Sequence, residues 1–71
     1  MSYFRFLAVQ FLRAKTLTQI TDLARLSYKG FSQDEIDVLV AISRIVTREI
    51  IAKRQEERGK EANNETGKTN A

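Results

Sequence analysis

The feature that most constrains this chain is the arrangement of its apolar residues, which fall into three clusters with no proline anywhere in the sequence. Glycine and Ser or Thr residues separate the clusters, at positions where helices begin and end. Spacings of three, four or seven residues within the clusters, as in Leu39, Val46 and Ile50, are typical of α-helices. The sequence therefore predicts an all-α protein, a small bundle of three helices at about 3–14, 17–29 and 33–58.

Two segments match a capping box, in which an N-cap hydroxyl and a Glu or Gln three residues later each accept a hydrogen bond from the other residue's backbone amide. One pairs Thr16 with Gln19, and the other pairs Ser32 with Glu35. These segments predict the starts of the second and third helices. Gly30 is expected to end the second helix in the left-handed conformation that glycine adopts without strain.

The last thirteen residues differ from the rest, because residues 59–71 contain no large apolar side chain. Such a segment buries too little surface to offset the entropy lost when a chain becomes ordered. We therefore expect one helical domain at 1–58 and a disordered polar tail at 59–71.

The first apolar cluster is apolar almost all round, whereas a surface helix needs only one apolar stripe. Its opening residues are Tyr3, Phe4, Phe6 and Leu7. They belong to the core, to a surface for self-association, or to a partner site. A membrane-surface contact is a further alternative, since the segment is aromatic and flanked by arginines.

The composition removes the side chains used in most catalytic and metal-binding sites. The chain has 71 residues and neither cysteine nor histidine, so disulfides, thiol nucleophiles, imidazole bases and the commonest zinc and haem ligands are missing. The only acidic cluster, Asp34, Glu35 and Asp37, lies in a first helical turn that favours anions, and no calcium-binding loop surrounds it. We expect no enzyme activity, metal or cofactor. Self-association is the remaining means of stabilising so small a core, which predicts a homodimer.

The net charge of +3 is unevenly distributed, with a cationic first part and a mildly anionic region at 31–52. Residues 17–42 have the outline of a helix-turn-helix, but the second helix would place Asp34 and Glu35 against phosphates. At most weak, nonspecific nucleic-acid binding is expected. The cations on the third helix either contact phosphate or an acidic protein, or form a solvated face; they are Arg44, Arg48, Lys53 and Arg54.

The opening apolar segment is too short to cross a bilayer and lacks the basic start and cleavage site of a secretory signal. We expect a cytoplasmic location and no stable membrane insertion.

Much of the chain resembles the Hha/YmoA family of nucleoid-associated expression modulators, a similarity that runs without a gap over residues 11–53. The residues that carry it are Phe11, Arg13, Thr16, Ile20, Phe31, Ser32, Glu35, Ile36, Glu49, Ile50 and Lys53. The resemblance implies a helical regulator that acts through a DNA-binding protein such as H-NS. The chain departs from the family at Arg44-Ile45-Val46, where the family has Asp-His-Arg, at Thr18 and Thr21, where it has acids, and in the charged tail that replaces a Pro- and Trp-containing end.

The leading hypothesis is a small non-enzymatic protein that modulates gene expression by protein-protein interaction with a DNA-binding or transcription protein. The alternative is a helical self-assembling adaptor module, of plasmid or phage type, with no direct role in transcription. Both hypotheses have the same candidate contact residues. They are the four residues that open the first apolar cluster and the four cations of the third helix.

Overall fold

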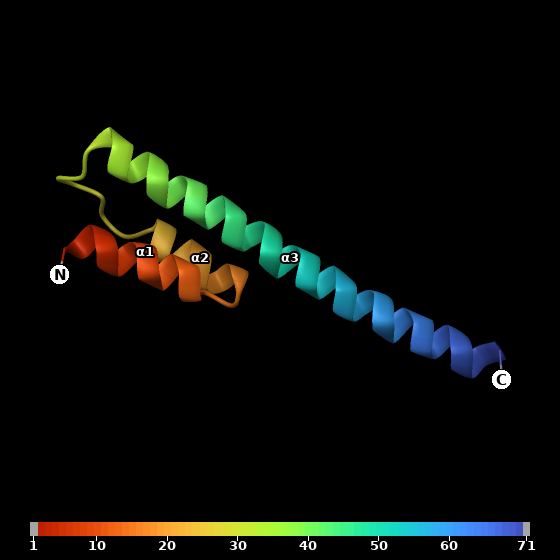
Figure 1. The fold of residues 1–71 in the computed structure, drawn as a ribbon. Helices are drawn as coiled ribbons and strands as arrows, with labels where there is room; N and C mark the ends of the chain where they lie inside the picture. Colours follow the sequence, from red (N-terminus) through yellow and green to blue (C-terminus); the bar gives the residue numbers. More distant parts are fainter. Residues whose placement is uncertain (1, 71) are drawn as a thin grey trace.

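The structure is a computed structural model that describes residues 2–70, with side chains described for 2–59. The described residues form three helices: α1 (Tyr3–Arg13), α2 (Leu17–Ala24) and α3 (Gln33–Asn70) (Figure 1). No strand occurs within the described residues. The predicted all-α class and the predicted number of helices are confirmed.

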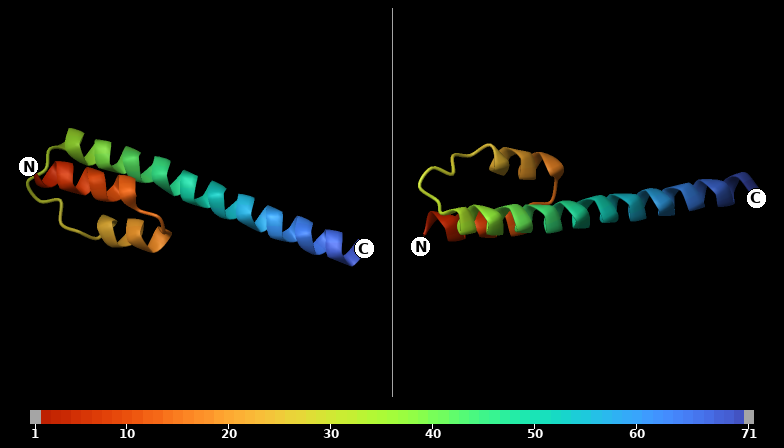
Figure 2. Two further views of the ribbon diagram at one scale, coloured as in Figure 1. Left: turned by 60° about the horizontal axis from the view of Figure 1, so that its bottom comes forward. Right: turned by 90° about the horizontal axis from the view of Figure 1, so that it is seen from above.

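The helices form two layers. α1 and α3 run side by side in the same direction, and α2 runs the opposite way behind them (Figures 1 and 2). The buried centre is made by Leu7 and Phe11 from α1 and Leu39 from α3, all at most 3 % exposed. Partly buried residues from all three helices and their connections pack around it: Phe4, Ala8, Ile20, Leu23, Tyr28, Phe31 and Ile42.

Both predicted capping boxes are present. The Gln19 amide donates to Thr16 Oγ1 and the Thr16 amide donates to Gln19 Oε1, each at 3.2 Å. At the start of α3, the Ser32 amide donates to Glu35 Oε1 at 2.9 Å, and the Glu35 amide donates to Ser32 Oγ at 3.1 Å. A third cap, which was not predicted, is Ser2: its hydroxyl accepts a hydrogen bond from the amide of the residue three positions later, at the start of α1.

The second helix is shorter than predicted, since α2 ends at Ala24 rather than near 29. The reason is Tyr28, whose hydroxyl donates to the Leu23 carbonyl oxygen at 2.7 Å and whose ring packs against Phe31. The last carbonyl oxygens of a helix lack partners within the helix. The Leu23 oxygen accepts from the Leu26 amide at 3.2 Å and from Tyr28, which adds its hydrogen bond by leaving the helical path. The end of α1 at Arg13 instead of 14 is within the usual uncertainty of helix boundaries.

Gly30 has the predicted positive φ, 91°, but it does not end α2. It lies in a tight turn closed by a hydrogen bond from the Phe31 amide to the Tyr28 carbonyl oxygen at 3.1 Å. A positive φ at the third residue of such a turn is the mark of type II geometry, which favours glycine. The prediction was right about the conformation and wrong about the element.

α3 extends to Asn70, twelve residues beyond the predicted end at 58. The predicted disordered tail, 59–71, falls almost entirely on residues whose side chains lie outside the described part of the chain, and it stays a prediction. All the buried residues among those described precede Ile50.

Candidate functional site

The four candidate residues at the start of α1 divide between core and surface. Leu7 is fully buried within this chain's own core, and Phe4 packs partly buried against that core. Tyr3 and Phe6 remain about half exposed and stack on each other with ring centroids 6.2 Å apart. Leu7 therefore offers no surface to a second chain, and only Tyr3 and Phe6 remain available for contact.

An aromatic cluster joins the start of α1 to the connection before α3. The Phe31 ring lies 5.7 Å from Tyr3, 6.3 Å edge-on from Phe4 and 5.8 Å from Tyr28, measured between centroids. Burial, and secondarily the nearby Tyr3, raise the pKa of Tyr28. These rings hold the start of α1 against the segment that leads into α3, so the cluster has a structural role.

The four candidate cations of α3 also divide into two pairs. Lys53 and Arg54 lie where α3 passes the end of α1, and both line a groove there. Arg44 and Arg48 are exposed one turn apart and do not line that groove. The structure thus brings two of the four predicted cations into one site.

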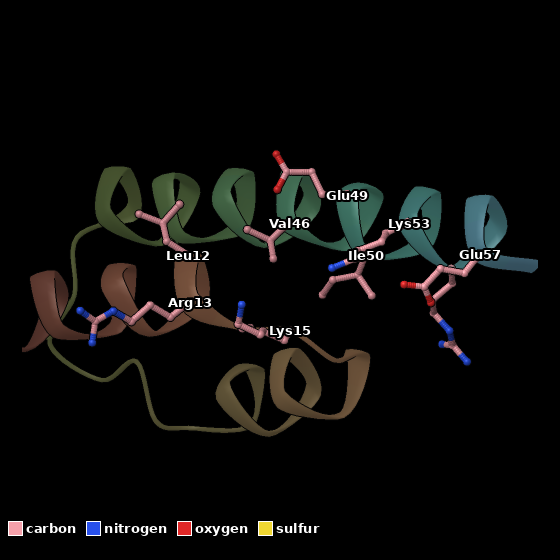
Figure 3. Close-up of a pocket in the computed structure, with 10 residues that line it drawn as sticks. Leu12, Arg13, Lys15, Val46, Glu49, Ile50, Lys53 and Glu57 are labelled. Atoms are coloured by element: carbon pink, nitrogen blue, oxygen red, sulfur yellow. The ribbon is translucent and has the colours of Figure 1, made fainter.

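The groove is an open cleft with a volume of about 600 Å³ (Figure 3). Its apolar floor combines the end of α1 with the middle of α3 in Leu12, Ala14, Val46 and Ile50. Val46 and Ile50 point from α3 toward the end of α1, as Figure 3 shows. Such a volume lies within the range of about 300–1,000 Å³ that is usual for ligand-binding clefts.

The rim of the groove carries more positive than negative side chains. The cations are Arg13, Lys15, Lys53 and Arg54, and the acids are Glu49 and Glu57. In Figure 3 the Glu49 carboxylate lies on the far side of α3 from Ile50, and the Arg13 guanidinium points toward the start of α1. Four cations against two acids leave the lining with a net positive charge. The arrangement suits an anionic ligand with apolar groups.

Two of the rim cations, Arg13 and Lys15, were not among the predicted contact residues. The only signal for them was the cationic character of the first part of the chain, which does not say where a site lies. They join Lys53 and Arg54 because α1 and α3 run in the same direction, which places the end of α1 beside the middle of α3 (Figure 2).

Other classes of site find no support in the described residues. They contain no group of three acidic side chains placed to hold a metal ion. None of the helices, within the same residues, combines the length and apolar character needed to cross a membrane.

Over residues 2–70, the fold and the groove define a small all-α protein of three helices with an open, cation-rimmed cleft between α1 and α3. No family model, curated protein or solved structure matches the chain. The resemblance to the Hha/YmoA family accordingly stays a prediction.

Proposed function

We propose that this chain is a non-enzymatic cytoplasmic module that modulates gene expression by docking onto a DNA-binding or transcription protein. The observation that carries the proposal is the groove between α1 and α3, where an apolar floor lies inside a rim of four cations. This combination favours a protein ligand over the other macromolecules considered.

The ligand that fits best is an acidic, amphipathic segment of the partner. Its apolar side chains would cover Val46 and Ile50, and its carboxylates would pair with Lys53 and Arg54. A nucleic-acid backbone would leave the apolar floor unused and would meet the Glu57 carboxylate at the rim. The groove therefore fits an acidic peptide better than phosphates.

The link to gene expression rests on the resemblance to the Hha/YmoA family. That family engages H-NS through an acidic surface, whereas the groove here is cationic. We propose that the mode of action is shared and that the charges are reversed, so that the partner contributes the acids.

The test compares proteins captured from the source cell's lysate by wild type and by a charge-reversed groove, Lys53→Glu with Arg54→Glu. Wild type is expected to capture a DNA-binding or transcription protein, and the variant is expected to lose it. Capture should also weaken as salt rises, because exposed ion pairs are screened.

The matched control is Arg25→Glu with Lys29→Glu, which makes the same change in net charge at exposed positions outside the groove. It should capture the same partner as wild type. Equal capture by the groove variant would rule out the groove as the docking site. A specific partner with no role in DNA binding or transcription would instead favour the adaptor hypothesis.

A further inference from the structure

We propose that the exposed side of α3 pairs with the same side of α3 from a second copy of this chain, with the two helices antiparallel. The interface is an exposed stripe whose positions alternate in steps of four and three residues, the spacing of a coiled-coil seam. Its members, all exposed, are Asp34, Val38, Ala41, Ile45, Arg48 and Ala52.

This α3 stripe faces away from the chain's own core. At about 100° per residue, Ala41 and Ile45 point away from the side that carries the buried Leu39 and Val46. α1 and α2 both lie on one side of α3 in Figure 1 and in the left view of Figure 2. A second helix therefore has open access to the stripe.

The apolar centre of the stripe lacks a partner within the described part of the chain. Val38 is 46 % exposed and Ile45 is 55 % exposed, the latter among the highest values for a large apolar residue here. Ala41 lies between them, and its small side chain lets two helix backbones approach closely. Pairing two copies buries four β-branched side chains at once, which adds to a core that is small for a free-standing domain.

The charged residues of the stripe determine whether the two α3 helices pair parallel or antiparallel. With the twofold axis near Ala41, Asp34 and Arg48 lie seven residues to either side, so each faces its opposite in the second copy. Asp37 and Arg44 share one edge of the stripe, four positions before Ala41 and three after it, so they approach each other across the axis as well. A parallel pair would set Asp34 against Asp34 and Arg48 against Arg48, which is repulsive. The antiparallel arrangement is the complementary one.

The groove stays open in this dimer. Its floor residue Ile50 lies nine positions from Ala41, so the two grooves are about 27 Å apart along the helix direction, on surfaces that do not include the stripe. If the groove binds a partner as proposed above, the dimer binds two copies of it and gains avidity when the partner is itself oligomeric. The self-association does not depend on that function.

The test measures the oligomeric state of the full chain by sedimentation equilibrium up to about 100 μM. Wild type is expected to be a dimer. Arg48→Asp should weaken dimerisation more than about tenfold, because Asp34 of each copy then faces a second aspartate across the interface. The double variant Asp34→Arg with Arg48→Asp restores opposite charges and should recover the dimer, a rescue that no loss of folding can imitate.

Two lysine substitutions separate the stripe from the rest of the helix. Ile45→Lys, in the stripe, should make the protein monomeric, whereas Val40→Lys, at an exposed β-branched residue outside the stripe, should leave the dimer intact. A monomeric wild type, a dimer that survives Ile45→Lys, or a charge-swapped double variant that stays monomeric would each overturn the proposal. The groove variant Lys53→Glu with Arg54→Glu should remain dimeric, so the dimer and the groove function can be refuted independently of each other.

Discussion

Tyr28 ties the connection between α2 and α3 to both of the elements it joins. Its hydroxyl donates to the Leu23 carbonyl oxygen at the end of α2, and its ring contacts Phe31 just before α3. Two residues on, Gly30 makes the reversal that brings α3 back beside α1. The path of residues 25–32 is therefore determined by the contacts of Tyr28 and by the backbone conformation of Gly30.

Replacement of Tyr28 by Phe should lower the free energy of unfolding by about 1 kcal/mol at pH 7, the usual net value of one hydrogen bond. Burial raises the pKa of Tyr28 above its ordinary 10.0, so the folded state holds this proton more tightly than the unfolded state. The stability contributed by Tyr28 is then fully present below pH 10 and is lost as pH rises through the folded-state pKa. Urea unfolding from about pH 7 to 11 measures the effect.

The gap in stability between wild type and Tyr28→Phe should therefore narrow above pH 10. Tyr3→Phe is the control for loss of a tyrosine hydroxyl, because no hydrogen bond from Tyr3 occurs within the described residues. It should leave the unfolding free energy at neutral pH unchanged. A constant gap across the pH range would contradict the assigned role of the Tyr28 hydroxyl.

Substitution of Gly30 by Ala should destabilise the protein by about 1–2 kcal/mol, because an L-residue is strained at positive φ. A Cβ at Gly30 meets no atom within 4 Å, so the cost comes from the backbone alone. Gly59 also has open space around it but lies in helical α3, where Ala is favoured by up to about 1 kcal/mol. Thermal unfolding should give lower stability for Gly30→Ala and no loss for Gly59→Ala.

The stability of α3 depends on the cap at its N-terminus. Ser32→Ala removes the hydroxyl that accepts the Glu35 amide and should cost about 1 kcal/mol, a fall in melting temperature of roughly 4–8 °C for a domain of this size. Ser43→Ala is a matched control within α3, where the hydroxyl only donates to the Val40 carbonyl oxygen and Ala is the better helix former. Circular dichroism melts of both variants should show a loss for Ser32→Ala alone.

Local sequence signals predicted where α2 and α3 begin. The features that were not predicted depend on contacts between residues far apart in the chain. The boxes at Thr16 and Ser32 are satisfied within four residues of chain, so the pattern alone identifies them. The end of α2 depends on Tyr28 finding a carbonyl and a ring to contact, which no local spacing reveals.

The groove between α1 and α3 could be predicted only in part. Lys53 and Arg54 were identified as candidates from the charge pattern, but their neighbours Arg13 and Lys15 meet them only through the direction in which α1 and α3 pair. Sequence periodicity shows which face of a helix is apolar and says nothing about whether two helices run parallel. The site therefore required the assembled structure.

A chain that ends at Arg58 should melt at the same temperature as the full chain. The buried residues Leu7, Phe11, Leu39 and Val46 all precede this point, and the groove ends at Glu57. Differential scanning calorimetry of the two lengths makes the comparison. A clear fall in melting temperature on truncation would show that residues 59–71 contribute to folding.

Direct binding of the isolated chain to duplex DNA should be weak and independent of sequence. The rim of the groove carries four cations, so it can neutralise about four phosphates. A plot of the logarithm of the binding constant against the logarithm of the salt concentration should therefore have a slope no steeper than about −4. Titration of labelled duplexes at several salt concentrations measures this slope. Nanomolar, sequence-selective binding at physiological salt would overturn docking through a protein as the mode of action.

The parallel pairing of α1 with α3 also affects the folding rate of the chain. Leu7 and Leu39 meet in the core although they are thirty-two positions apart, so the decisive contact must wait for a long loop to close. We expect that α2, by forming early, shortens the flexible part of that loop and speeds its closure. Inserting flexible residues between Leu26 and Ser27 should consequently slow folding with little change in the unfolding rate. The insertion adds closure entropy, and the Leu26 hydrogen bond, the Tyr28–Phe31 turn and the Ser32 cap all stay on unbroken segments of chain.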